Sequence, residues 1–474
     1  MRGAPLRRSA ALGFVFGWVA YAGGYHWLWR LIGVFFGGNL LLGAAVWLAD
    51  SAWFAMRFAL YAALYALVRR RGWPVAAAGV APLLAVEWVY PLLFPVHLGH
   101  ALMELPVAIQ IADLGGPLLM TSVLALINAA VLESWRWWRR ERRRPTATLG
   151  LAAAGVLFTV GYGWIRLRQI DAAVAAAPSL RVGVVQGNLG VHEKGTQSVV
   201  DHRRYLEQTE ALLAAGDVDL VVWPETVYTR GLRGPLPISG KYVRESSYVP
   251  LLFGGAYVGV ETGQRLRYNA ALLVDADGVI RSVYEKNLLI PFTEYVPFAD
   301  LFPALGERLQ ETSRFSAATE VTPLRLREWR ISTPICYEVV RPAFVRRMLV
   351  EAKPHLLVTL ANDSWFGDSQ GPWMHLSMAR FRAVEHRRYL VRATNSGISA
   401  VIDPAGRMVA RSRLLTRENL RATVHPLDVT PPYTRLGDWP GWLAAAATAL
   451  FLVVSPQAPV STIMERGLPA SQRE

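Results

Sequence analysis

The sequence predicts a multi-span helical membrane bundle joined to an extracytoplasmic α/β domain, and three observations indicate this fold class. The first is composition: 53% of the 474 residues are hydrophobic and 17 are tryptophan, more than a water-soluble enzyme usually carries. The second is a series of long apolar segments in the first third of the chain and one more near its end. The third is a central region in which short apolar runs alternate with helical segments, as in α/β domains.

Six apolar segments have the length of membrane-spanning helices. An α-helix rises about 1.5 Å per residue and the hydrocarbon core is about 30 Å thick, so about 20 apolar residues cross it. The first segment continues into others without a small-residue cleavage site, which argues against a removed signal peptide. We predict about five spans within residues 1–170, a final span within residues 438–455 and a cytoplasmic tail over residues 456–474. The predicted spans are residues 10–29, 40–67, 75–94, 117–132, 147–165 and 439–454.

Clusters of arginine predict the orientation of these spans. Arg69 to Arg71 and the arginines between Arg136 and Arg144 lie in connections on one side, whereas residues 97–114, on the other side, contain no Lys or Arg. Basic connections stay in the cytoplasm. An odd number of preceding spans then delivers residues 180–433 to the extracytoplasmic face. The net charge of +14 is therefore explained by topology, and we expect no nucleic-acid partner.

The central region, residues 180–433, is predicted to be one α/β domain with two sheets flanked by helices. Residues 202–215 and 375–388 have helical patterns. Residues 275–278 and 403–406 each separate two apolar runs and contain Asp and Gly, which is typical of hairpin turns. The predicted strands are residues 181–186, 220–223, 251–258, 270–274, 331–335, 356–360, 389–393 and 398–402.

Cys336 is the only cysteine, and it follows an apolar run, residues 330–335, that is predicted to be a buried strand. A thiol at a strand end, beside Tyr337 and Glu338, is a candidate nucleophile, although most lone cysteines are small buried hydrophobes. One cysteine excludes an intrachain disulfide and a thiolate zinc cluster. The nine histidines show no metal-ligand spacing, so we predict no metal and no cofactor.

Two further polar side chains lie at the ends of apolar runs. Glu225 ends the run that starts at residue 219, and Lys286 lies in an otherwise apolar stretch. A sheet presents its chemistry at strand ends, and a thiol needs a base or a positive neighbour to become a nucleophile. Glu, Lys and Cys in this order resemble the nitrilase (carbon-nitrogen hydrolase) superfamily, which implies an αββα sandwich. The resemblance implies that Glu225 takes the proton from Cys336 and later activates the second substrate. Lys286 and the backbone N–H of Tyr337 would stabilise the oxyanion.

The combination of membrane spans and nitrilase-like motifs resembles, more narrowly, the apolipoprotein N-acyltransferase family. The motifs that carry this resemblance are Trp223-Pro224-Glu225, Lys286-Asn287, Pro291-Phe292-Thr293-Glu294-Tyr295-Val296-Pro297, Ile335-Cys336-Tyr337-Glu338, Asn362-Asp363-Ser364-Trp365-Phe366-Gly367 and Arg392-Ala393-Thr394-Asn395-Ser396-Gly397.

The family resemblance implies an activity, substrates and a location. An acyl chain would pass from a phospholipid, through a thioester on Cys336, to the α-amine of a diacylglyceryl-cysteine at an apolipoprotein N-terminus. The protein would act as a monomer in the bacterial inner membrane, with its catalytic domain in the periplasm. The alternative is a membrane-tethered amidase that hydrolyses a small amide.

The same resemblance implies supporting roles for five residues. Glu294 would assist the catalytic group by orienting Lys286; the alternative is an exposed loop carboxylate. Tyr337 and Glu338 would shape the site beside the nucleophile. Trp365 and Phe366 would belong to an apolar lip that admits acyl chains. The alternative for this pair is ordinary core packing.

The sequence departs from the family pattern in two places. Family members usually have about eight spans, so the resemblance implies that two N-terminal helices are absent from this chain. After Gln186-Gly187-Asn188 the family pattern has a Trp followed by an acidic residue, whereas this chain has His192-Glu193-Lys194. This second departure concerns substrate positioning more than the chemistry.

Overall fold

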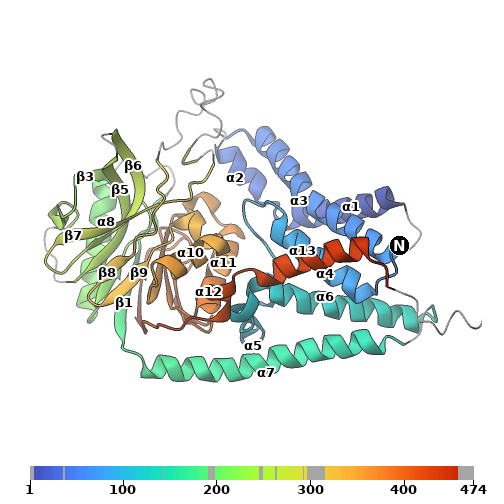
Figure 1. Ribbon diagram of the computed structural model, residues 1–474. Coiled ribbons are helices and arrows are strands. Elements are labelled where there is room, and N and C mark those ends of the chain that lie inside the picture. The colour runs from blue at the N-terminus through green and yellow to red at the C-terminus, as the bar shows by residue number, and fades with distance from the viewer. Residues whose placement is uncertain are drawn as a thin grey trace, which may run out of the picture. The chain divides into compact units, whose positions relative to one another are not determined.

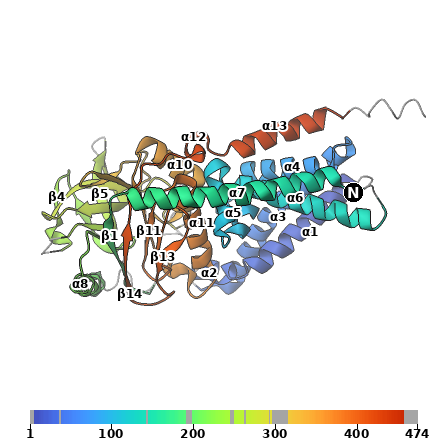
Figure 2. The ribbon, with the colours of Figure 1, turned by 90° about the horizontal axis from the view of Figure 1, so that it is seen from below.

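The computed structural model divides the chain into two compact units (Figures 1 and 2). The helical unit comprises Met1–Pro91, Thr121–Val156 and Trp439–Glu474, and the α/β unit comprises Leu92–Met120 and Leu157–Asp438. The structure describes residues 5–35, 38–141, 144–190, 198–244, 249–261, 264–291, 293–295 and 315–456.

A helix covers part of each of the six predicted spans. Among the described residues, three helices are long and apolar enough to cross a membrane, namely α3, α6 and α7, and the apolar helices α4 and α13 are shorter. The division between the units falls within α6 and α7, and α7 continues beyond residue 170. The helix bounds are α1 Leu6–Gly24, α2 Leu28–Phe35, α3 Leu40–Arg70, α4 Val75–Val89, α6 Ala112–Trp138, α7 Thr146–Ala176 and α13 Trp439–Val453.

Two of these helices end earlier than the sequence predicts. Helix α4 stops at Val89 instead of continuing to Phe94, and Tyr90 has extended backbone angles (φ −70°, ψ 122°). The residue before a proline avoids the helical region, and Pro91 follows Tyr90. Helix α1 ends at Gly24, and a short turn leads into α2, which the sequence did not predict. Glycine favours helix ends because it loses more backbone freedom in a helix than other residues do.

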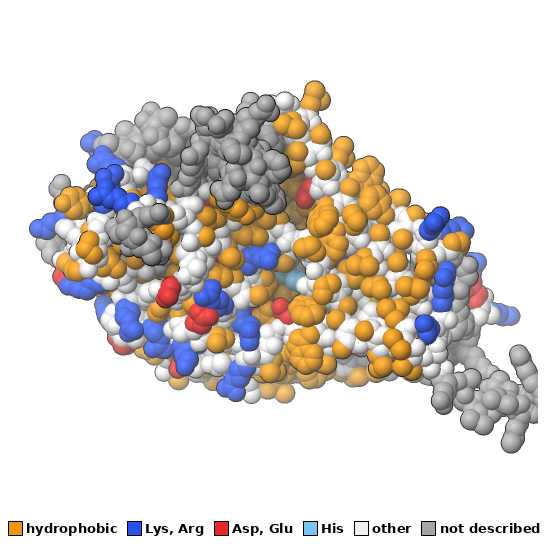
Figure 3. Space-filling model, turned by 45° about the horizontal axis from the view of Figure 1, so that its top comes forward, with side chains coloured by type: hydrophobic (Ala, Val, Ile, Leu, Met, Phe, Trp, Pro, Cys, Tyr) orange, Lys and Arg blue, Asp and Glu red, His pale blue; other side chains and the backbone are white. Residues whose placement is uncertain are grey.

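The helical unit has an apolar surface and a buried ion pair. Figure 3 shows that apolar side chains dominate its visible face. Inside it, Arg57 of α3 donates to Glu87 of α4 across 3.2 Å, and Thr121 of α6 donates to the same carboxylate across 2.9 Å. Opposite charges buried together avoid the cost of leaving either one unpaired in an apolar medium. These bonds therefore connect α3, α4 and α6.

The α/β unit contains an eight-stranded and a six-stranded sheet. The first has the order β14-β1-β2-β5-β6-β7-β4 with β3 beside β5, and the second has the order β13-β12-β11-β10-β9-β8. Strands of the first sheet are β1 Leu180–Gln186, β2 Leu220–Val222, β3 Tyr228–Arg233, β4 Ile238–Ser239, β5 Leu251–Glu261, β6 Gln264–Val274, β7 Val279–Glu285 and β14 Glu418–Val424. Strands of the second sheet are β8 Leu324–Leu326, β9 Trp329–Ser332, β10 Leu356–Ala361, β11 Leu390–Thr394, β12 Ala400–Ile402 and β13 Met408–Arg411.

Four layers build this unit. Alternate side chains of β1, such as Val182 and Val184, pack between the sheets against residues of the second sheet such as Val358. Val185 faces the other way and packs with residues of α8 (Ser198–Ala214). Helices α10 (Pro342–Glu351) and α11 (Gly371–His386) pack on the outer face of the second sheet. Figure 1 shows α8 on one side of the unit and α10 with α11 on the other. The predicted αββα sandwich is confirmed.

The predicted hairpin turns are also confirmed. Strands β6 and β7 pair antiparallel, as do β12 and β13. Gly278 (φ +78°) and Gly406 (φ +84°) adopt the left-handed conformation that a turn of this kind requires and that glycine accepts without a Cβ clash. The remaining short elements of the unit are η1 Leu98–Leu102, α5 Pro106–Ile109, η2 Gly240–Tyr242, η3 Cys336–Val340, η4 Asp363–Phe366 and α12 Pro432–Leu436.

Candidate active site

The three candidate catalytic residues lie just beyond strands of the two facing sheets. Glu225 follows β2, Lys286 follows β7, and Cys336 begins the short 3-10 helix η3 after β9. The predicted strand before Cys336 is shorter than expected, because β9 ends at Ser332 and Ile335 forms only an isolated bridge with Leu360 of β10. Proline at position 334 cannot donate a ladder hydrogen bond, which accounts for the early end.

Lys286 lies between two carboxylates. Its Nζ is 2.8 Å from Glu294 Oε1 and 3.4 Å from Glu225 Oε1, and its side chain is fully buried. Asn269 Nδ2 donates to both of the same carboxylate oxygens, across 2.8 Å to Glu225 and 2.9 Å to Glu294. The backbone N–H of Ile290 donates to Glu294 Oε2 across 2.9 Å. Glu294 is therefore a buried partner of Lys286 and not an exposed loop carboxylate.

This arrangement fixes the charge on Lys286. Burial alone would lower the pKa of the lysine, but the charges of Glu294 and Glu225 outweigh it and raise that pKa above its usual value. An ammonium with such a pKa stays protonated through any physiological change of pH. Lys286 therefore brings a protonated ammonium into the site, which suits the stabilisation of developing negative charge.

The surroundings of the Cys336 thiol favour its neutral form, in contrast to those of Lys286. Although part of the residue stays exposed, burial raises the pKa of the thiol well above its usual value; the charge of Glu225 raises it further, and Lys286 opposes both. The resting side chain is therefore a thiol, and a nucleophilic thiolate forms only when a base takes the proton. Glu225 acts electrostatically on the thiol, so its carboxylate is suited to this role.

The backbone at Cys336 is in an uncommon conformation. Its φ of +49° lies in the left-handed region, which costs a residue with a side chain on the order of 1–3 kcal/mol. Such a conformation persists only when neighbouring contacts hold it. On one side, Thr359 Oγ1 of β10 donates to the carbonyl oxygen of Pro334 across 2.7 Å and ties the incoming chain to the sheet.

Glu338 supplies a second restraint, because its buried carboxylate accepts four hydrogen bonds. Oε2 accepts from the backbone N–H of Ile335 and the hydroxyl of Tyr284, both across 2.8 Å. Oε1 accepts from the N–H groups of Asn287 (2.7 Å) and Leu288 (3.0 Å). Burial raises the pKa of Glu338 to about 7, against the lowering effects of Lys286 and these donors. Glu338 therefore ties the loop of Lys286 to the loop of Cys336.

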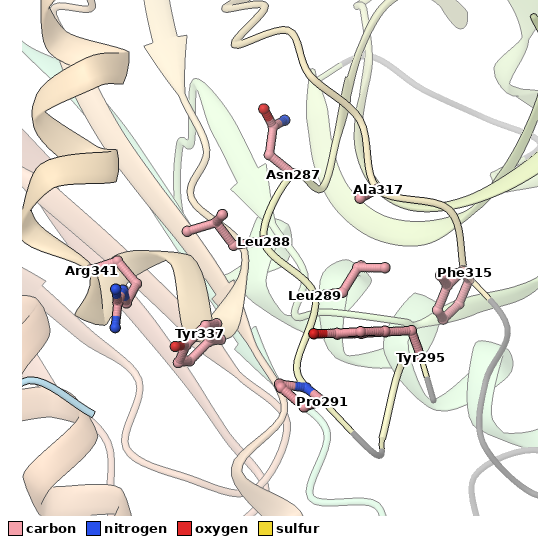
Figure 4. Close-up of a pocket in the computed structure, with 9 residues that line it drawn as sticks. All are labelled: Asn287, Leu288, Leu289, Pro291, Tyr295, Phe315, Ala317, Tyr337 and Arg341. Carbon is pink, nitrogen blue, oxygen red and sulfur yellow. The ribbon is translucent and has the colours of Figure 1, made fainter. Parts of the chain in front are cut away.

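A cavity of about 530 Å³ lies beside these loops. Figure 4 shows Leu289, Tyr295 and Phe315 on one part of its wall and Leu288 and Tyr337 on another. The hydroxyl of Tyr337 donates to the carbonyl oxygen of Leu93 across 2.8 Å, which fixes the ring. The full lining is Asn287, Leu288, Leu289, Pro291, Tyr295, Phe315, Ala317, Tyr337 and Arg341. An apolar wall of this kind suits a hydrocarbon chain.

Trp365 and Phe366 lie on η4 and are not among the residues that line this cavity. Trp365 is 41% exposed. The ring of Phe366 packs on Gly371, where a Cβ would come within 2.6 Å of it. Residues His192, Glu193 and Lys194 lie outside the described residues.

Three polar residues of the site region received no role in the sequence analysis, although two of them, Asp363 and Arg392, belong to motifs quoted there. Asp363 Oδ2 accepts from Arg392 Nη2 across 2.6 Å, Asp363 Oδ1 lies 2.8 Å from His375 Nδ1, and all three side chains are buried. Burial alone would raise the pKa of Asp363, but Arg392 and His375 lower it to about 2. Asn269 was missed as well. These residues could have been found in the sequence as polar residues within or just after buried strands, as at Asn269 and Arg392, because a buried polar side chain needs a partner.

Comparison with known proteins gives matches along most of the chain. Residues 181–431 match the family model described as "Carbon-nitrogen hydrolase", and residues 2–130 match the one described as "Apolipoprotein N-acyltransferase N-terminal domain". The apolipoprotein N-acyltransferase of Azotobacter vinelandii is 34% identical over 462 residues, which cover 95% of this chain and 87% of that protein. The protein of the same name from Pseudomonas putida is 32% identical over 94% of this chain and 87% of its own length. That from Geobacter metallireducens is 31% identical over 94% and 86%.

Proposed function

The chain belongs to the apolipoprotein N-acyltransferase family, within the carbon-nitrogen hydrolase superfamily, and from this premise we propose how its site works. Cys336 takes an acyl chain from a phospholipid and passes it to the α-amine of the diacylglyceryl-cysteine of an apolipoprotein. The observation that supports this most directly is the buried group of Lys286, Glu225 and Glu294, whose charges act on the Cys336 thiol. The protein is a membrane protein, which gives it access to both lipid-anchored substrates.

The first half-reaction forms the acyl-enzyme. Glu225 takes the thiol proton, and Sγ of Cys336 attacks the carbonyl carbon of the phospholipid ester. The Lys286 ammonium and the backbone N–H of Tyr337 stabilise the tetrahedral oxyanion. The carbon–oxygen bond to the glycerol then breaks, and Glu225 returns the proton to the leaving oxygen. The products are a thioester on Cys336 and a lysophospholipid.

In the second half-reaction the thioester is the acyl donor and Cys336 is the leaving group. The α-amine of the apolipoprotein attacks the thioester carbonyl, and Glu225 takes a proton from the amine. The same two donors stabilise the second oxyanion. The carbon–sulfur bond breaks as the amide bond remains, and the Cys336 sulfur recovers its proton. Since one chain supplies every group in both steps, we propose that the monomer is the active form.

Repeated turnover requires both substrates, and this gives a direct test. The purified protein in phosphatidylethanolamine vesicles is expected to release about one lysophospholipid per enzyme without acceptor, and many when a diacylglyceryl-cysteine peptide is added. Mass spectrometry of lysophospholipid and of the peptide measures both products, with Cys336→Ala as control. Repeated release of lysophospholipid and free fatty acid without the peptide would instead show a hydrolase with water as acceptor.

We further propose that the protein lies in the bacterial inner membrane with its catalytic domain in the periplasm. The positive-inside rule supports this. By the count of predicted spans, Arg69 to Arg71 and the arginines after Arg136 fall on the membrane side opposite to the catalytic domain. In a Cys336→Ala background, Ala214→Cys on the exposed end of α8 should react with a membrane-impermeant maleimide in intact spheroplasts. Glu141→Cys, in an arginine-rich connection, should react only after lysis. The reverse pattern would refute this orientation.

A further inference from the structure

His375 is a buried residue near the nucleophile that the proposed reaction does not use. It lies on α11, and its Nε2 is 3.2 Å from the backbone carbonyl oxygen of Cys336. A carbonyl oxygen only accepts hydrogen bonds, so Nε2 carries a hydrogen and donates it. The contact is made with the backbone of the nucleophile and is therefore distinct from a base that would activate its thiol.

The other side of the imidazole is held by charged groups. Nδ1 of His375 lies 2.8 Å from Asp363 Oδ1 and 3.1 Å from Arg392 Nη2. In the neutral ring that donates from Nε2, Nδ1 carries no hydrogen and accepts from Arg392 Nη2. A side chain at position 397 would collide with Asp363, so Gly397 allows the close approach that holds this carboxylate in place.

The carbonyl group that His375 contacts belongs to the amide unit that joins Cys336 to Tyr337. Its N–H belongs to Tyr337 and is the backbone donor of the proposed oxyanion site. An amide is planar, so a bond that fixes the direction of the C=O also fixes the direction of the N–H. A donor at the oxygen also polarises the amide and strengthens its N–H as a donor, as in cooperative hydrogen-bond chains. The left-handed backbone of Cys336 (φ +49°) is an uncommon conformation, and the contact from His375 is one of those that hold this segment.

We propose that His375 is a positioning residue for the oxyanion site: by donating to the carbonyl oxygen of Cys336, it orients and polarises the amide whose N–H stabilises the tetrahedral intermediate. Asp363 and Arg392 hold the imidazole in place. This inference rests on the proposed function, because it requires the Tyr337 N–H to face the oxyanion. The proposal assigns the role to Nε2 alone, so an experiment can distinguish the effect of Nε2 from that of Nδ1.

Two amide variants separate them. In His375→Gln the side-chain NH2 reaches about as far as Nε2 and can still donate to Cys336, whereas in His375→Asn it reaches only as far as Nδ1. We expect His375→Asn to slow acyl-enzyme formation about 10- to 100-fold, less than removal of a direct oxyanion donor, with little change in KM. His375→Gln should stay within a few-fold of the parent protein. His386→Asn, at a buried histidine on the same helix that contacts Thr434, is the matched control and should leave the rate unchanged.

A spectroscopic measurement tests the hydrogen bond itself. Because Cys336 is the only cysteine, carbonyl-13C cysteine with 15N tyrosine labels a single peptide bond in the full-length protein. Its carbonyl 13C resonance should move upfield in His375→Asn and return toward the parent position in His375→Gln. The 15N–H resonance of Tyr337 should shift with it, while His386→Asn should leave both resonances in place.

The outcomes are distinct. An unchanged carbonyl resonance in His375→Asn would overturn the contact, and a shifted resonance with an unchanged acylation rate would overturn its role at the oxyanion. Equal loss of rate in His375→Gln and His375→Asn would also overturn the proposal. If His375→Asn does not fold, a comparable loss of rate in folded His375→Gln would overturn it. Failure of the proposed function would look different: the parent protein would form no acyl-enzyme, yet the resonance shifts would remain.

Discussion

Replacing Cys336 with alanine is expected to lower acyl transfer by at least about 1,000-fold while the protein keeps its fold. No other thiol in the chain can form the thioester, since this is the only cysteine. The substitution removes a single sulfur atom from a partly exposed position, so its cost in stability is small compared with its effect on the reaction. Mass spectrometry of the purified protein should show an acyl adduct on the parent chain alone.

Cys336→Ser is the sharper companion variant. Its hydroxyl occupies the same place, but it loses a proton far less readily than a thiol, so we expect no acyl-enzyme from it either. Thermal unfolding of both variants in detergent checks that the fold is kept. An adduct on the alanine variant would place the nucleophile elsewhere and would refute the assignment of Cys336.

Lys286→Met is expected to reduce acyl-enzyme formation by about 100- to 1,000-fold, the range for loss of a main oxyanion donor. Methionine keeps much of the apolar stem of lysine but lacks the ammonium. The negative charge on the tetrahedral oxyanion would therefore have no positive side chain beside it. The same change leaves Glu225 and Glu294 buried on either side of an uncharged side chain. We therefore expect a lower melting temperature as well, since breaking a buried ion pair leaves unpaired charge.

A second variant separates the two effects. Lys286→Met combined with Glu294→Gln removes one of the two carboxylate charges, and we expect it to recover most of the melting temperature but not the rate. Single-turnover formation of the thioester, followed by mass spectrometry, measures the chemical step. A near-normal yield of acyl-enzyme in Lys286→Met would refute the oxyanion role of this lysine.

The candidate catalytic residues could be located from the sequence because each is attached to a local pattern. Glu225 and Cys336 follow apolar runs that form strands or lead out of them. Lys286 was noticed because it lies in an otherwise apolar stretch, although β7, which it follows, was not predicted. The partners of these residues could not be located in this way. Asn269 lies inside β6 and reaches Glu225 and Glu294 only because the sheet places them together.

The same distinction applies to the fold. Interior strands that are apolar along most of their length, such as β2, β10 and β11, are predicted by the sequence, whereas β7, an interior strand that contains Arg281 and Ser282, was missed. Strand β14 was missed because it is an edge strand whose side chains are mostly polar, although it pairs with β1 over its whole length. The end of α4 was misplaced because apolar residues continue past Val89. The helix ends there because the proline that follows Tyr90 disfavours helical backbone angles at Tyr90.

The high pKa of the Cys336 thiol also has a consequence for survival of the enzyme between turnovers. Oxidants such as peroxides attack the thiolate and spare the thiol, and the product, a sulfenic acid, is normally rescued by a second cysteine. This chain has no second cysteine to do so. In the proposed reaction the proton stays on sulfur until Glu225 removes it, and this limits the reactive form to the moments of attack and turnover. In the oxidising compartment proposed for this domain, the resting state thus protects the nucleophile from damage that the chain has no internal means to repair.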